Sequence, residues 1–150
     1  MDLTKSPHGQ KAMEYFKEGY NCAQSVLLAY AEECGMEKEM AVRLSSSFGA
    51  GMGRLRQVCG AVSGMFMVAG MLYGYDSPKD QKGKAEHYQR IQHLAARFRE
   101  ENGSIICKEL LGLTENTFSH IPEERTKEYY KKRPCGQIVG MAAAMLEEEV

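Results

Sequence analysis

Apolar side chains recur three and four residues apart along the whole chain, which is the spacing of one face of an α-helix. No segment alternates apolar and polar residues with a period of two for long enough to predict a strand. Together with capping residues, glycines and prolines, the pattern predicts helices over about 7–18, 22–34, 38–46, 58–75, 77–101, 107–111, 122–132 and 135–149. The predicted fold class is therefore an all-α helical bundle.

The segment 57–75 carries no charged side chain and is apolar on every side of a helix. It is about long enough to cross a bilayer, but its four glycines and few leucines are more typical of a buried helix in a bundle. Its glycines are spaced four apart, as Gly60 with Gly64 and Gly70 with Gly74, and are expected to let neighbouring helices approach closely. Residues 1–150 are predicted to form a single helical domain around this central glycine-rich helix.

Charge and composition narrow the classes of partner. The 19 Lys and Arg residues nearly balance the 20 Asp and Glu residues, so neither nucleic acid nor an anionic membrane surface is expected as a partner. The first residues lack the basic-then-apolar order of a secretory signal, and we expect the protein to be cytoplasmic. In that reducing compartment, cysteines are more often free, catalytic or metal-bound than cross-linked.

Four of the five cysteines fall where a different helix is predicted to begin, namely Cys22, Cys59, Cys107 and Cys135. A capping residue, a glycine loop or a proline precedes each of them. The positive end of the helix dipole stabilises a negative sulfur, so all four thiols are expected to ionise more easily than an ordinary thiol. Cys34 differs because it lies just before Gly35, at the expected end of a helix.

The chain contains no Cys-x-x-Cys pair, which excludes the usual zinc-ribbon, thioredoxin and bacterial ferredoxin patterns. A shared site must therefore be assembled by the fold. Three chemical interpretations stay open: an iron–sulfur cluster for electron transfer or sensing, thiol–disulfide exchange without metal, and zinc held by four sulfurs. In a fourth interpretation the protein is a non-catalytic assembly module, such as a homodimer packed through the central helix, and its cysteines are core residues.

Several motifs occur in a specific order over about residues 21–146. They are Asn21-Cys22-Ala23-Gln24, then 48–53 leading to Val58-Cys59-Gly60-Ala61-Val62-Ser63-Gly64, then Cys107-Lys108-Glu109-Leu110-Leu111-Gly112, then Pro134-Cys135. In this order they resemble the redox-active protein family named for its C…GCAxxG…C…C cysteine motif, which is distantly related to split-Soret cytochrome c. The family name writes glycine before the second cysteine, whereas here Gly60 follows Cys59.

The resemblance implies a small all-helical bacterial or archaeal protein with a redox or metal-binding role. Cys22, Cys59, Cys107 and Cys135 would then share one site, as catalytic thiols and as ligands of an iron–sulfur cluster, with zinc or no metal as alternatives. No haem attachment signal is present, so only the cluster role of the cytochrome relative can carry over. The resemblance does not identify the redox partner.

The glycine loop before Cys59 is a weak candidate for anion binding. Gly51, Gly53 and Arg54, with Arg56 nearby, can hold a phosphate or carboxylate, but the loop lacks the P-loop lysine and the dinucleotide fingerprint, and a structural turn is the alternative. Other side chains are expected to be structural. We expect single exposed histidines (His8, His87, His93 and His120), core methionines (Met65, Met67 and Met71) and a solvated acidic segment (147–149).

Overall fold

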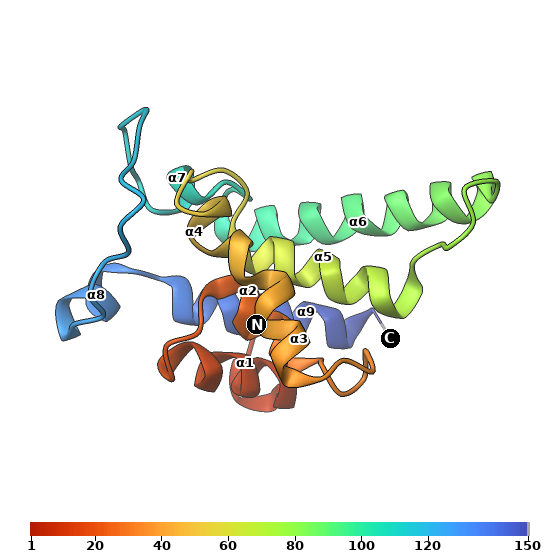
Figure 1. The fold of residues 1–150 in the computed structure, drawn as a ribbon, viewed down its shortest axis with the longest axis horizontal. Helices are drawn as coiled ribbons and strands as arrows, with labels where there is room; N and C mark the ends of the chain where they lie inside the picture. Colours follow the sequence, from red (N-terminus) through yellow and green to blue (C-terminus); the bar gives the residue numbers. More distant parts are fainter. Residues whose placement is uncertain (150) are drawn as a thin grey trace.

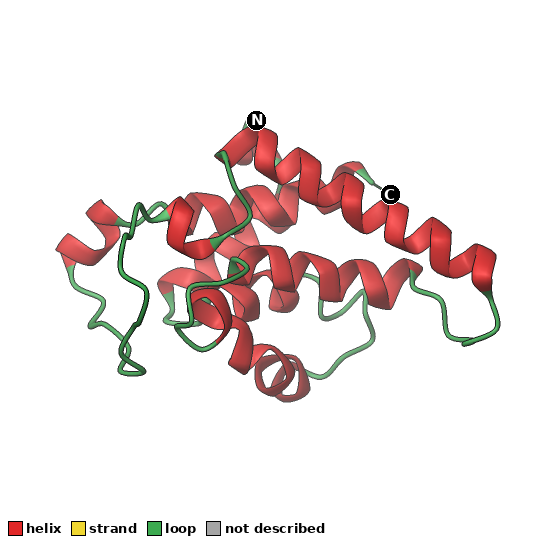
Figure 2. Ribbon diagram, turned by 90° about the horizontal axis from the view of Figure 1, so that it is seen from above, coloured by secondary structure: helices red, strands yellow, loops and turns green. Residues whose placement is uncertain are grey.

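The computed structural model describes residues 1–149, except the side chain of Lys132. Helices and loops make up this part of the chain, as Figure 2 shows, and the predicted all-α fold is confirmed. The helices are α1 (Pro7–Lys17), α2 (Cys22–Ala29), α3 (Lys38–Ser45), α4 (Gly49–Met52), α5 (Gly60–Tyr73), α6 (Gln81–Asn102), α7 (Cys107–Leu110), α8 (Lys127–Lys132) and α9 (Cys135–Glu148), with short 3-10 turns at Leu3–Lys5 and Ser46–Phe48.

The core lies where α2, α5 and α9 pack together, with α1 covering α9 and α2 (Figure 1). Helix α6 runs alongside α5, and the segment that carries α7 and α8 occupies one end of the bundle (Figure 1). Most residues of α5 from Gly60 to Ala69 are buried, including Val62, Met65 and Val68. None of the described helices is both long enough and apolar enough to span a membrane.

The glycines of α5 do not all serve close packing. A Cβ at Gly64 would lie 2.8 Å from the carbonyl oxygen of Ala23, and one at Gly60 would lie 3.0 Å from the Cβ of Cys22. These two positions bring α5 against α2, as the sequence predicts. A Cβ at Gly70 would meet nothing within 4 Å, so the expected close approach at this end of the helix is wrong.

Helix starts follow the local capping residues more closely than helix ends do. Ser6 caps α1 and Asn21 forms a capping box with Gln24 at the start of α2, as predicted. Helix α2 ends at Ala29 rather than at residue 34, and turns lead from there to Gly35, whose φ is 67°. Helix α8 begins at Lys127 rather than at residue 122. None of the side chains in 113–126 is fully buried, so no apolar face stabilises a helix there.

Some side chains expected in the core are exposed, and some expected in solvent are not. Met71 is 54% exposed, because it lies at the end of α5 that extends beyond the core. His87 is buried, with its Nδ1 3.1 Å from Arg90 Nη1. The acidic segment is not simply solvated, since Glu148 and Glu149 pair with Arg97 of α6. The ion pairs of Arg97 join α6 to the end of α9.

His8 links α1, α9 and the turn after α2. Its Nδ1 lies 2.8 Å from Glu147 Oε1, and its Nε2 lies 2.9 Å from Glu33 Oε1. The imidazole stacks on the Tyr30 ring at a centroid distance of 4.0 Å. Burial raises the pKa of both carboxyl groups, but the hydrogen bonds from His8 outweigh this effect and hold both pKa values below the usual range.

Replacing His8 with alanine is expected to lower the free energy of unfolding by up to about 1 kcal/mol at neutral pH, since these partly exposed pairs are weakened by solvent. Carboxyl groups with lowered pKa values stabilise the fold above their unfolded pKa of about 4.3, and the contribution disappears as pH falls through the folded values. Thermal unfolding at pH 6 and pH 3 measures both effects. The difference in stability between wild type and His8→Ala should be smaller at pH 3. The exposed-site control His120→Ala should be as stable as wild type at both pH values.

Candidate functional site

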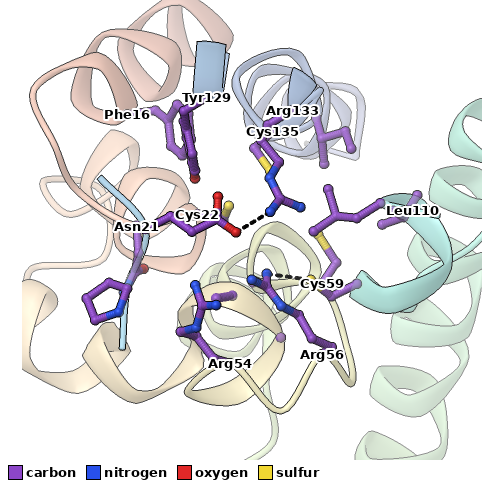
Figure 3. Close-up of a pocket in the computed structure, with 18 of the residues that line it drawn as sticks. Phe16, Asn21, Cys22, Arg54, Arg56, Cys59, Leu110, Tyr129, Arg133 and Cys135 are labelled. Carbon is purple, nitrogen blue, oxygen red and sulfur yellow. Dashed lines mark hydrogen bonds and ion pairs between the residues drawn. The ribbon is translucent and has the colours of Figure 1, made fainter. Parts of the chain in front are cut away.

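The four cysteines predicted to share a site line one cavity of about 140 Å³ (Figure 3). Cys22, Cys107 and Cys135 are the first residues of α2, α7 and α9, and Cys59 directly precedes α5. All five thiols of the chain are free, and Cys34 lies outside the cavity lining. The predicted placement of the four cysteines at helix starts is therefore confirmed to within one residue.

Backbone pairing between residues 57–59 and residues 105–107, which we call the clasp, fixes one wall of the cavity. Val58 and Ile106 form an isolated antiparallel bridge between the segments before α5 and α7. Beside it, the Cys59 N–H donates to the Ile105 carbonyl at 2.8 Å, and the Cys107 N–H donates to the Gln57 carbonyl at 2.6 Å. The clasp therefore sets the positions of two thiols that are far apart in the sequence.

The glycine loop forms a left-handed turn beside this clasp. The sequence predicts that no regular helix forms here, and α4 indeed has left-handed backbone angles, with φ of 56° at Ala50 and 72° at Gly51. Met52, Arg54 and Arg56 also have positive φ. A left-handed conformation costs about 1–2 kcal/mol for each residue other than glycine. Such strain is typical of functional sites, where the surrounding structure holds it in place.

Gly51 sits at the closest approach of the left-handed turn to the clasp. A Cβ at this position would lie 2.7 Å from the Cβ of Cys107 and 2.7 Å from the Cα of Arg56. The Gly51 carbonyl accepts a hydrogen bond from the Gln57 N–H at 2.9 Å. Glycine is required here both for its positive φ and for the lack of space.

Four arginines line the cavity with the thiols, namely Arg54, Arg56, Arg125 and Arg133. Arg125 donates to the carbonyls of Phe16 and Tyr20, and its guanidinium lies 4.2 Å from the Phe16 ring centre. Arg133 pairs with Glu123, and Arg54 Nε donates to the Ser119 carbonyl at 2.8 Å. The segment 113–133 thus contributes two of these four partners, Ser119 and Glu123, and the region of α1 contributes the other two.

Arg56 is the most buried of the four, with 6% of its surface exposed. Its Nη1 lies 3.6 Å from Cys107 Sγ, and its guanidinium lies 5.9 Å from the Phe118 ring centre. Within residues 1–149, its Nε has no hydrogen-bond partner. Figure 3 shows the guanidinium groups of Arg56 and Arg133 pointing into the cavity among the cysteines.

The thiols differ strongly in acidity. Burial raises the pKa of Cys59 to about 12 and also raises the pKa of Cys107, despite the opposing effect of Arg56. The interaction with Cys135, and then burial, raise the pKa of Cys22. A hydrogen bond from Cys22, helped by Arg133, outweighs burial at Cys135 and lowers its pKa to about 7. The expectation of four easily ionised thiols is wrong for three of them. Burial disfavours the charged form of Cys59 and Cys107 more than the helix start favours it, and at Cys22 the interaction with Cys135 has the larger effect.

No three His, Cys, Asp or Glu side chains in the described part of the chain are grouped closely enough to hold a metal ion. The described residues therefore show no site for a single metal ion, and the iron–sulfur cluster and the zinc ion stay predictions. Of the residues predicted to bind an anion, Gly51 and Arg54 line the cavity and Gly53 does not.

Sequence reasoning missed Arg125 and Arg133 as site residues. Arg133 stands two residues before Cys135, and this proximity was a signal available in the sequence. Arg125 gave no such signal, because its place in the cavity depends on an irregular segment. Both arginines add positive charge beside the thiols.

A family model described as "Putative redox-active protein (C_GCAxxG_C_C)" matches residues 20–149. Searches of curated proteins and of solved structures give no match. The matched range contains all four cysteines that line the cavity.

Proposed function

Because the chain belongs to this redox-active family, we propose that it acts by thiol–disulfide exchange, with Cys135 as the attacking thiolate and Cys22 as the resolving thiol. The observation that carries the proposal is that these two thiols line one cavity, where their mutual interaction is the largest influence on the pKa of each. The thiolate is the nucleophile in exchange, and an attacking thiol with a pKa near the ambient pH is the most effective. Cys135 meets this condition.

The proposed reaction reduces a disulfide by two electrons. The Cys135 thiolate attacks one sulfur of the substrate, the substrate S–S bond breaks, and a thiolate leaves. Cys22 then attacks the sulfur of Cys135 in the mixed disulfide, and the proton of its thiol passes to a released substrate thiolate. The products are a Cys22–Cys135 disulfide, one substrate thiol and one substrate thiolate. An external dithiol reductant, which is itself oxidised to a disulfide, restores the two cysteines.

Cys59 and Cys107 have a different part in this proposal. Burial raises the pKa of both groups, so they stay protonated near neutral pH and are poor nucleophiles. They form the cavity wall beside Arg56. The exchange chemistry is therefore proposed to depend on one pair rather than on all four thiols.

The proposal is tested by peptide mapping. Protein oxidised with 2-hydroxyethyl disulfide is alkylated, digested without reduction and analysed by mass spectrometry. We expect a Cys22–Cys135 disulfide and an alkylated Cys34, which lies outside the cavity lining. A different cysteine pair, or no disulfide at all, would refute the proposed pair.

A bound metal or iron–sulfur cluster is the second candidate, because four sulfurs line one cavity and thiolates are soft ligands. Such a group would supply electron transfer or sensing. The absorption spectrum of anaerobically purified protein, before and after dithionite, separates the candidates. Broad visible absorption that bleaches on reduction would replace the exchange proposal with a cluster. A colourless, zinc-free protein would support metal-free exchange.

A further inference from the structure

Positive charge exceeds negative charge around the cavity. Four arginines line it, and Glu123 is the only acidic residue among the lining residues of the described chain. Glu123 is already paired with Arg133. Arg54 and Arg125 donate hydrogen bonds to backbone carbonyls. The cation that lacks a comparable partner is Arg56.

Burial makes the position of Arg56 costly. A guanidinium withdrawn from water needs hydrogen-bond acceptors and an opposite charge to offset the loss of its hydration. Arg56 is 94% buried, its Nε is unpartnered within residues 1–149, and the one described hydrogen bond of its side chain goes to the weak acceptor sulfur of Cys107. An anion in the cavity would supply what the side chain lacks.

We infer that the cavity binds a small anionic disulfide, whose carboxylate or sulfonate contacts Arg56 while its sulfur meets Cys135. The inference rests on the proposed exchange reaction. The bonds formed and broken are the same as in that reaction, because the anionic group of the substrate takes no part in the exchange. Arg56 and Cys135 are close enough for the guanidinium to stabilise the Cys135 thiolate electrostatically. A charge-assisted hydrogen bond from a guanidinium to a carboxylate is about twice as strong as a neutral one.

The size of the cavity limits the ligand. Its volume of about 140 Å³ is well below the roughly 300–1,000 Å³ of pockets that take drug-sized ligands. The space suits a short aliphatic disulfide or one end of a longer molecule. The sequence analysis placed a weak candidate anion site at Gly51, Gly53 and Arg54, with Arg56 nearby, and the inferred anchor is Arg56.

Three aliphatic disulfides of different charge test the inference: dithiodiglycolate (anionic), 2-hydroxyethyl disulfide (neutral) and cystamine (cationic). The rate of mixed-disulfide formation at Cys135 is measured for each by quenched-flow mass spectrometry and divided by its rate with free 2-mercaptoethanol. We expect the normalised rate with dithiodiglycolate to exceed that with the neutral disulfide by about tenfold, and the advantage to shrink as salt is added. Equal normalised rates for all three probes would overturn the inference.

Arg56→Gln should abolish the preference for the anionic probe, and Arg56→Lys should restore part of it. The ratio of anionic to neutral rates is the readout, because Arg56 also affects the Cys135 thiolate itself. Arg43→Gln is the matched control, since Arg43 lies on α3 with 81% of its side chain exposed. An unchanged ratio in a folded Arg56→Gln variant would contradict the assigned anchor. If circular dichroism shows that this variant is unfolded, the wild-type probe series and its salt dependence decide.

Calorimetric titration with thiodiglycolate, which has no disulfide bond, separates the two proposals. Binding that Arg56→Gln weakens by about tenfold, without exchange at Cys135, would keep the anion site and refute the exchange reaction. If the protein exchanges with 2-hydroxyethyl disulfide, does not bind thiodiglycolate and reacts no faster with the anionic disulfide, the exchange reaction is kept and the anion site is refuted.

Discussion

Cys135→Ser is expected to slow the reaction with 2-hydroxyethyl disulfide at pH 7 by at least about 100-fold. A thiol with a pKa of about 12, such as Cys59, has only about 10⁻⁵ of its molecules as thiolate at this pH. Its thiolate is more nucleophilic than that of Cys135 by about 10²-fold, which does not make up for the low thiolate fraction. Cys59 therefore cannot replace Cys135. The rate of mixed-disulfide formation measures the loss, and Cys34→Ala, outside the cavity lining, is the control that should keep the wild-type rate. A Cys135→Ser variant as fast as wild type would refute the assignment of the nucleophile.

The same assignment predicts a pH profile. Iodoacetamide alkylation of Cys135 should rise with pH and reach half of its maximal rate near pH 7, because Cys22 and the arginines favour the thiolate. Cys22→Ala removes the hydrogen-bond donor and should move the midpoint up, toward the ordinary thiol value of about 8.5. The same variant should accumulate a mixed disulfide that wild type resolves. A midpoint that does not move would show that Cys22 does not stabilise the thiolate.

Gly51→Ala is expected to lower the free energy of unfolding by about 3 kcal/mol, the sum of a clash and a left-handed alanine. The new methyl group would meet the Cβ of Cys107 and the Cα of Arg56, both at 2.7 Å, and neither atom is at the end of a flexible side chain. Urea unfolding followed by circular dichroism gives the magnitude. Disulfide reactivity should change as well, because the clash displaces the wall that carries Arg56 and Cys107.

Ala50→Gly provides the matched change in the same turn. Ala50 has a φ of 56°, so glycine removes the cost of a left-handed alanine, and the variant should be as stable as wild type or more stable by up to about 1 kcal/mol. The two substitutions therefore have effects of opposite sign at neighbouring residues. If Gly51→Ala were as stable as wild type, the close packing of the turn against the clasp would be wrong.

Helix starts were predictable because their signals are local. Ser6 and Asn21 use their own side chains to satisfy the first N–H groups of α1 and α2, and any reader of the sequence can locate them. The end of α2 depends on packing against distant segments, which a single sequence does not contain. The start of α8 does have a local signal, because the Thr126 side chain caps it, and the predicted start at residue 122 missed that signal. The fold class and the helix order could therefore be predicted, and the end of α2 could not.

The sequence predicted which cysteines lie together, but it did not predict their acidities. Helix-start signals and the family motif selected Cys22, Cys59, Cys107 and Cys135, and all four line one cavity. Their acidities depend on burial and on nearby arginines, and these are properties of the folded chain. Arg125 enters the site from an irregular segment, so no periodic pattern could have revealed it.

Helix α9 follows every other described helix in the chain, yet it carries Cys135 and packs on α1, α2 and α5. During synthesis, a ribosome releases Cys22, Cys59 and Cys107 before Cys135 has emerged. The apolar face of α1, with Ala12 and Phe16, must wait for α9 before it is fully covered. A nascent chain at this stage lacks the proposed nucleophile, and its first three cavity cysteines are exposed without Cys135. The order of synthesis therefore keeps the proposed reactive pair from forming until α9 packs against the other helices.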